Sequence, residues 1–97
     1  MKRDIYKKEE YYLGDWCYVL IRLFKNSING NYEVKLLAKN DLIKEKLKFE
    51  TSYKEFKFAK ICYDNWRNTF IKMPKELEKE MGEPKLKKQY METYKAL

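Results

Sequence analysis

Aromatic rings and cations alternate along one apolar stretch of the chain, an arrangement that could bind a partner. Trp16, Tyr18, Arg22 and Phe24 all fall at even positions between residues 15 and 24. In a β-strand, even positions share one face. Rings beside cations can stack on bases while the cations meet phosphates, and Tyr, Trp and Arg also dominate protein–protein hot spots. The sequence therefore predicts a binding surface on this strand.

Residues for catalysis or metal binding are scarce. The chain has no histidine, which removes the commonest general base and a common zinc ligand. Its three glycines, Gly14, Gly30 and Gly82, form no phosphate-binding loop. Cys17 and Cys62 lie in apolar stretches, which is typical of cysteines in a core. We expect no catalytic residue, no metal site, no cofactor and no enzymatic activity.

Length and hydropathy indicate one domain that stays in the cytoplasm. A chain of 97 residues is sufficient for a single core. No apolar run approaches the roughly 18–20 residues that span a bilayer. The first ten residues lack the apolar segment of a signal peptide. We therefore expect a cytoplasmic location and no membrane partner.

The net charge of +7 has two explanations. Among the 22 basic residues only Arg3, Arg22 and Arg67 are arginines. The positive charge is spread evenly along the chain, whereas nucleic-acid-binding tails usually segregate it. The chain is also rich in Tyr, Asn and Ile, as an AT-rich coding sequence would be. Both function and codon usage could account for the charge.

The elements that would position these residues begin with a sheet. Residues 1–13 read as a charged arm, and residues 14–51 as a three-stranded antiparallel sheet. Asn29-Gly30 is a strong signal for a two-residue hairpin turn, because both residues tolerate positive φ. The pattern of β-branched and aromatic residues places strands over 15–24, 32–39 and 44–51.

The hairpin also predicts which side chains share a face. With Asn29 and Gly30 as the turn, Leu23 pairs with Leu36 and Ile21 pairs with Ala38 on an apolar inner face. The opposite face then carries the expected partner-binding residues Trp16, Tyr18, Arg22, Phe24, Lys35, Lys39, Lys46 and Lys48. Three interpretations of this opposite face stay open. It is covered by the C-terminal helix, exposed for a protein, or exposed for nucleic acid.

Helices fill the second half of the expected fold. Ser52 and Glu55 form a capping-box pattern at the start of a long helix over 52–73. That helix should end before Pro74, because proline disfavours helical conformation in the preceding residue. Two shorter helices follow over 74–97, separated at Gly82. The fold class predicted is α+β, in the order β-β-β-α-α-α.

The long helix offers a second, weaker candidate surface. Its cations away from the apolar stripe are Lys54, Lys57, Lys60 and Arg67. Such a pattern is usually a solvated helix face, and it could also follow a phosphate backbone.

Two functions follow from these surfaces. The first is a small non-enzymatic protein that binds a larger protein partner. A narrower form is an inhibitor of a host nucleic-acid-handling system, of the anti-CRISPR type made by bacterial viruses and mobile elements. The alternative is a small basic DNA- or RNA-binding module that recognises mainly the backbone. The oligomeric state is not predictable from the sequence.

Overall fold

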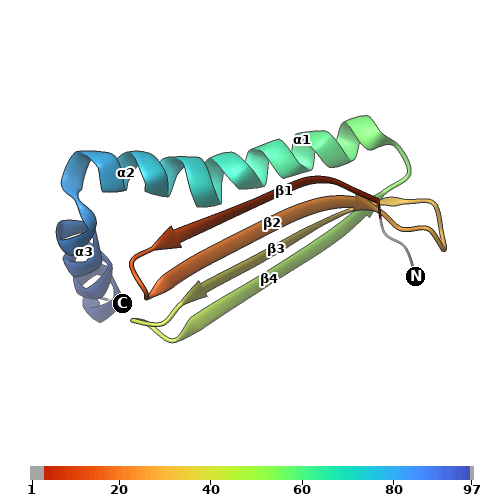
Figure 1. Cartoon of the computed structure of the whole chain (residues 1–97). Coiled ribbons are helices and arrows are strands. Elements are labelled where there is room, and N and C mark those ends of the chain that lie inside the picture. Colours follow the sequence, from red (N-terminus) through yellow and green to blue (C-terminus); the bar gives the residue numbers. More distant parts are fainter. Residues whose placement is uncertain (1–3, 97) are drawn as a thin grey trace.

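A four-stranded antiparallel sheet carries the helices on one face and at one end (Figure 1). The computed structural model describes residues 4–96, with side chains described for residues 5–92. Each strand pairs with its neighbour in the chain. The strands are β1 (Asp4–Leu13), β2 (Cys17–Lys25), β3 (Tyr32–Asn40) and β4 (Glu45–Tyr53). The predicted α+β class is confirmed, but the prediction of three strands is wrong.

The fourth strand, β1, stands where a charged arm was expected. It pairs along β2, with Tyr12 opposite Tyr18. Its inward-facing positions include Lys7 and Glu9, whose charges hide the apolar alternation that would mark a strand. Those charges are neutralised from the helical layer, where Arg67 bonds to Glu9. Residues 1–3 of the expected arm and residue 97 of the last helix lie outside the described residues.

The hairpin between β2 and β3 has a longer loop than predicted. Residues 26–31 connect the strands, and the Gly30 N–H donates to the Asn26 carbonyl at 2.8 Å. Leu23 consequently pairs with Val34, and Leu36 pairs with Ile21. The predicted pairing of Leu23 with Leu36 is therefore wrong by two residues. Because side chains alternate with a period of two, this shift leaves both leucines on the predicted inner face.

The helical layer begins later than predicted. The helical elements are α1 (Phe56–Arg67), a π-helical turn η1 (Asn68–Lys72), α2 (Met73–Met81) and α3 (Glu83–Ala96). Ser52 belongs to β4, and the residue before α1 is Glu55, which makes no side-chain capping bond. The predicted capping box is therefore wrong. Gly82, at φ 81°, ends α2 as predicted.

The long helix does not end before Pro74. It continues through the π-helical turn into α2, and the two helices follow each other along one side of the sheet (Figure 1). The Met73 N–H donates to the Asn68 carbonyl, five residues back, which is the wider π-type bond. A wider turn gives the proline ring room where an α-helical carbonyl would clash with it. Local widening thus replaces the expected helix end.

The core lies between the inner face of the sheet and the helices. Its fully buried members come from β1, β2, β3, α1, η1 and α3, and include Leu13, Ile21, Leu23, Val34, Ile71 and Leu86. Trp16 belongs to this core, with 3% of its surface exposed. Its ring lies 5.6 Å from that of Tyr90 in α3, and its Nε1–H donates to Glu83 at 2.6 Å. The expected position of Trp16 on the opposite face is therefore wrong.

Buried phenols and thiols predict a loss of stability at alkaline pH. Burial is the main cause that raises the pKa of Tyr11, Tyr63, Tyr90 and Cys17. The folded protein therefore retains these protons at pH values where the unfolded chain, with pKa values of about 8.5 for Cys and 10 for Tyr, has lost them. Stability is full below about pH 8.5 and falls as the pH rises above it.

Urea unfolding at a series of pH values measures this loss, with phenolate absorbance recorded in parallel. Tyr11→Phe is the matched variant, because it removes one titrating phenol and should therefore lose less stability between about pH 9 and 11 than the wild type. Full ionisation of all tyrosines near pH 10 in a still-folded protein would contradict the expectation.

Candidate functional site

The face of the sheet opposite the helices is open along its length (Figure 1). We call it the outer face, and the strand registers define its members. β1 contributes Ile5, Lys8, Glu10 and Tyr12, and β2 contributes Tyr18, Leu20, Arg22 and Phe24. β3 contributes Glu33, Lys35, Leu37 and Lys39, and β4 contributes Lys46, Lys48, Glu50 and Ser52. The interpretation that the C-terminal helix covers this face is wrong, because Leu86 and Tyr90 pack into the core on the other side.

One row across the outer face joins two rings to two cations. Tyr12 lies opposite Tyr18, Tyr18 opposite Lys39, and Lys39 opposite Lys46. The two rings contact each other with centroids 4.8 Å apart, and Tyr12 is 62% exposed. We call these four residues the tyrosine–lysine row. It places polar aromatic surface and positive charge side by side at one end of the sheet.

The lysines of this row oppose each other on neighbouring strands, and Lys39 lines a hollow that it shares with Asp15 and Asp41. Lys39 and Lys46 are directly opposite on neighbouring strands, a like-charge arrangement that destabilises a sheet. Among the described residues neither lysine forms an ion pair, and both are exposed. The burial of Tyr18 raises its pKa, so its hydroxyl stays protonated beside them. This end of the outer face can therefore attract an anionic group.

Apolar and mixed-charge residues occupy the rest of the outer face. Leu20 and Leu37 lie opposite each other near its centre, both partly exposed. Phe24 is nearly fully buried, and the Arg22 guanidinium and the Lys35 ammonium lie over its ring at 5.9 and 5.5 Å from the centroid. Cation stems thus cover this ring, which a partner could reach only by displacing them.

The structure brings seven of the eight predicted partner-binding residues together on the outer face. The eighth, Trp16, lies in the core behind it. Tyr12 was missed, because residues 1–13 were assigned to an arm. The Tyr11-Tyr12-Leu13 sequence was the available signal, since it ends the charged segment with three residues that favour strands.

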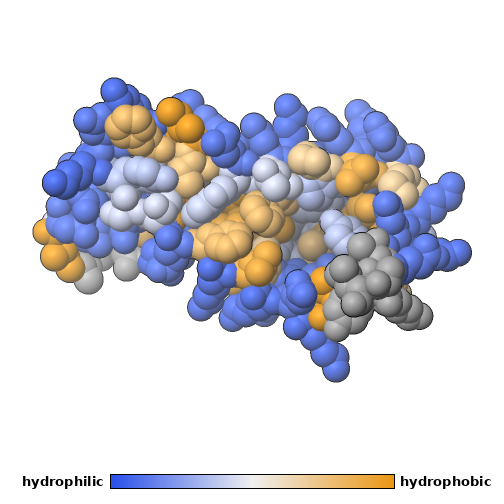
Figure 2. Space-filling model, turned by 180° about the vertical axis from the view of Figure 1, so that it is seen from behind, coloured by the Kyte–Doolittle hydropathy of each residue, from blue (hydrophilic) through white to orange (hydrophobic). Residues whose placement is uncertain are grey.

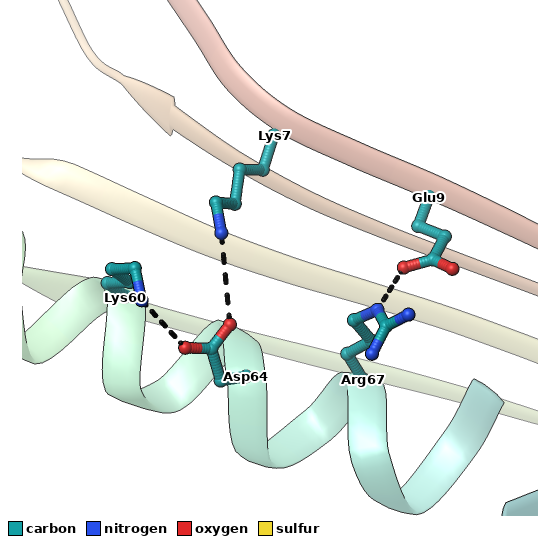
Figure 3. Close-up of polar contacts among 5 residues, drawn as sticks. All are labelled: Lys7, Glu9, Lys60, Asp64 and Arg67. Carbon is teal, nitrogen blue, oxygen red and sulfur yellow. Dashed lines mark hydrogen bonds and ion pairs between the residues drawn. The ribbon is translucent and has the colours of Figure 1, made fainter. Parts of the chain in front are cut away.

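The second predicted surface, on α1, is not a row of unpaired cations. Arg67 Nε donates to Glu9, and the Lys60 ammonium lies 3.1 Å from Asp64 (Figure 3). Lys57 pairs with Glu55 at 3.5 Å. Lys54 is exposed in the segment before the helix. Three of these four cations therefore already have carboxylate partners within the chain, and the outer face is the better candidate site.

Other kinds of site have little basis in the described part of the chain. Within residues 4–96 no group of three acidic or cysteine side chains converges in a way that could hold a metal ion. None of the described helices has the length and apolar content needed to cross a bilayer.

No protein-family model, no curated protein and no solved structure matches this chain.

Proposed function

We propose that the protein is a non-enzymatic binding protein whose outer face contacts an acidic region of a larger protein partner. The observation that carries this proposal is the tyrosine–lysine row, with opposed Lys39 and Lys46 on an uncovered sheet. An acidic partner would neutralise two lysines that repel each other in the free protein. The row would then bind more favourably than its contacts alone suggest.

The mixed charge of the outer face favours protein over nucleic acid. Glu10, Glu33 and Glu50 are interleaved with its cations, and each would repel a phosphate backbone. A protein surface can meet both signs of charge and can also cover the apolar centre at Leu20 and Leu37. Tyrosine and arginine are the residue types that most often carry binding energy in such contacts.

A narrower form of the proposal is inhibition of a host nucleic-acid-handling system, in the manner of anti-CRISPR proteins. The sign of the charge restricts how this could work. A protein of net charge +7 would be repelled by the basic channels that hold nucleic acid. Such an inhibitor would instead dock on an acidic surface of its target.

The alternative function, binding of DNA or RNA, has support from the same row. Two tyrosine rings beside two lysines can stack on bases and contact phosphates. If this alternative holds, affinity should fall steeply with salt, because bound counterions are released.

Capture from an extract of the native host tests the proposal. We expect a variant with Tyr12→Ala, Lys39→Glu and Lys46→Glu to capture at least about tenfold less of the partner protein, since hot-spot residues dominate affinity. The matched control, Lys85→Glu with Lys88→Glu on α3, should retain the partner. Equal recovery of the partner by the row variant would overturn the proposal.

Fluorescence anisotropy with random single-stranded and duplex oligonucleotides distinguishes the alternative, binding of nucleic acid, from the proposed binding of a protein. At about 150 mM salt, a nucleic-acid binder should show a dissociation constant of roughly 10⁻⁴–10⁻⁶ M. Such binding by the wild type, lost in the row variant, would replace the proposed protein partner with nucleic acid. If a captured protein is an enzyme acting on nucleic acid, loss of its activity on addition of the protein tests the inhibitor form.

A further inference from the structure

The two edges of the sheet differ in how they are protected. β1 has an irregularity between Ile5 and Lys7, and its inward-facing Lys7 and Glu9 are charged. Bulges and inward-pointing charges are devices that prevent edge-to-edge pairing. β4 pairs with β3 in an unbroken register, and its inward-facing Leu47 and Phe49 are apolar. The β4 edge therefore lacks these protections of the β1 edge.

Apolar surface is exposed along the β4 edge. Leu47 is 40% exposed and Phe49 is 41% exposed, although both point to the inner face. Phe58 of α1, one helical turn before Cys62, is 48% exposed. The ring of Trp66, one helical turn after Cys62, lies 5.9 Å from that of Phe49 in β4, which places this side of α1 above the edge. From behind, hydrophobic side chains gather in the middle of the molecule, surrounded by hydrophilic ones (Figure 2).

We propose that two copies of the chain pair antiparallel through their β4 strands, about a two-fold axis at Phe49. The pairing joins two four-stranded sheets into one of eight strands and keeps both helical layers on the same side. It satisfies the unpaired backbone groups of β4 and covers part of Leu47 and Phe49. This inference is independent of the proposed function.

The sequence of β4 is complementary to itself in this register. To keep inner residues beside inner residues, the axis must pass through a residue and not between two residues. About Phe49, Lys48 of each copy lies opposite Glu50 of the other, Phe49 meets Phe49, and Lys46 meets Ser52. Opposite charges on facing strands stabilise the pair, and like charges destabilise it.

Neighbouring registers are poorer. An axis at Leu47 places Lys46 opposite Lys48. An axis at Lys48 places the two Lys48 side chains opposite each other, and an axis at Glu50 places the two Glu50 carboxylates opposite each other. Among these four central positions only Phe49 avoids a like-charge contact. Charge complementarity therefore selects both the occupant, a second copy of this chain, and its register.

A charge swap tests the pairing. Sedimentation equilibrium from about 1 to 200 µM should show the wild type approaching twice the 12.0 kDa of one chain. Lys48→Glu and Glu50→Lys each turn two attractive contacts into repulsive ones, and each should weaken the dimer at least about tenfold. An equimolar mixture of the two variants restores opposite charges in a heterodimer, and should regain the wild-type affinity.

The masses measured for the wild type and the variants decide whether two copies pair through β4. A wild-type mass that stays at one chain throughout the concentration range would overturn the proposal. So would a dimer that neither charge change weakens. If Lys48→Glu strengthens the dimer, the axis lies at Leu47, where the change turns the Lys46–Lys48 contacts into attractive ones, and the proposed register is wrong. Lys48 and Glu50 are both exposed, and circular dichroism verifies that each variant is folded.

Discussion

Replacing Trp16 by alanine is expected to destabilise the folded protein by about 3–5 kcal/mol, as for other large buried aromatic residues. The side chain is 3% exposed, contacts Tyr90 and donates its indole N–H to Glu83. Its removal leaves a cavity between the sheet and α3 and leaves that carboxylate without this donor. Urea unfolding measures the loss. Since a domain is stable by only about 5–15 kcal/mol, the variant should unfold at a much lower urea concentration.

Two further measurements identify the cause of that loss. Trp16→Phe keeps most of the buried ring and loses the donor, so its destabilisation should lie between those of the wild type and the alanine variant. The alternative, which the sequence suggested, makes Trp16 an exposed contact for a partner. A Trp16→Ala protein of unchanged stability that no longer captures its partner would restore that interpretation.

The adjacent leucines of β3 should respond in opposite ways to the same substitution. Leu36 is 2% exposed on the inner face, whereas Leu37 is partly exposed on the outer face. Leu36→Asp buries an unpaired carboxylate at a cost of several kcal/mol, enough to unfold most of the protein at neutral pH. Leu37→Asp leaves its carboxylate in water, and we expect a loss of about 1 kcal/mol or less.

Circular dichroism and urea unfolding of both variants make the comparison. The two substitutions remove the same side chain and add the same charge one residue apart, so composition and net charge are identical. Equal destabilisation by the two variants would show that both faces are core, and the outer face could then no longer be the binding surface. Leu37→Asp should also weaken partner binding, because it places negative charge in the centre of a face proposed to meet an acidic surface.

Much of the sheet was predictable because its signals are local. The alternation in β2 and the turn residues after it place Leu23 and Leu36 on the same face, as observed. The predicted register was wrong by two residues. The loop is closed by hydrogen bonds of Asn26, three residues before the Asn-Gly pair that signals the turn. Period-two alternation tolerates such an error, so the outer face was predicted more reliably than its pairings.

The errors arose where contacts between distant segments decide the structure. β1 was missed because Lys7 and Glu9 become tolerable inward residues only when Asp64 and Arg67 lie above them. Trp16 was misplaced because it precedes β2, which begins at Cys17. The chain turns at Gly14, with a φ of +57°, so the alternation of side chains in β2 does not extend back to Trp16. No local pattern in the sequence reports either contact. The predicted set of binding residues therefore included Trp16, which is buried, and omitted Tyr12, which is exposed.

The order of elements has a consequence for the synthesis of this protein. All four strands precede the first helix in the chain. Each strand pairs with the strand next to it in the sequence, so its partner is synthesised directly before or after it. Such sequential contacts favour rapid folding. The inner apolar face of the sheet, however, is complete some residues before α1 emerges to cover it. During that interval the nascent chain exposes Ile21, Leu23 and Leu36, which is when a chaperone would be most useful.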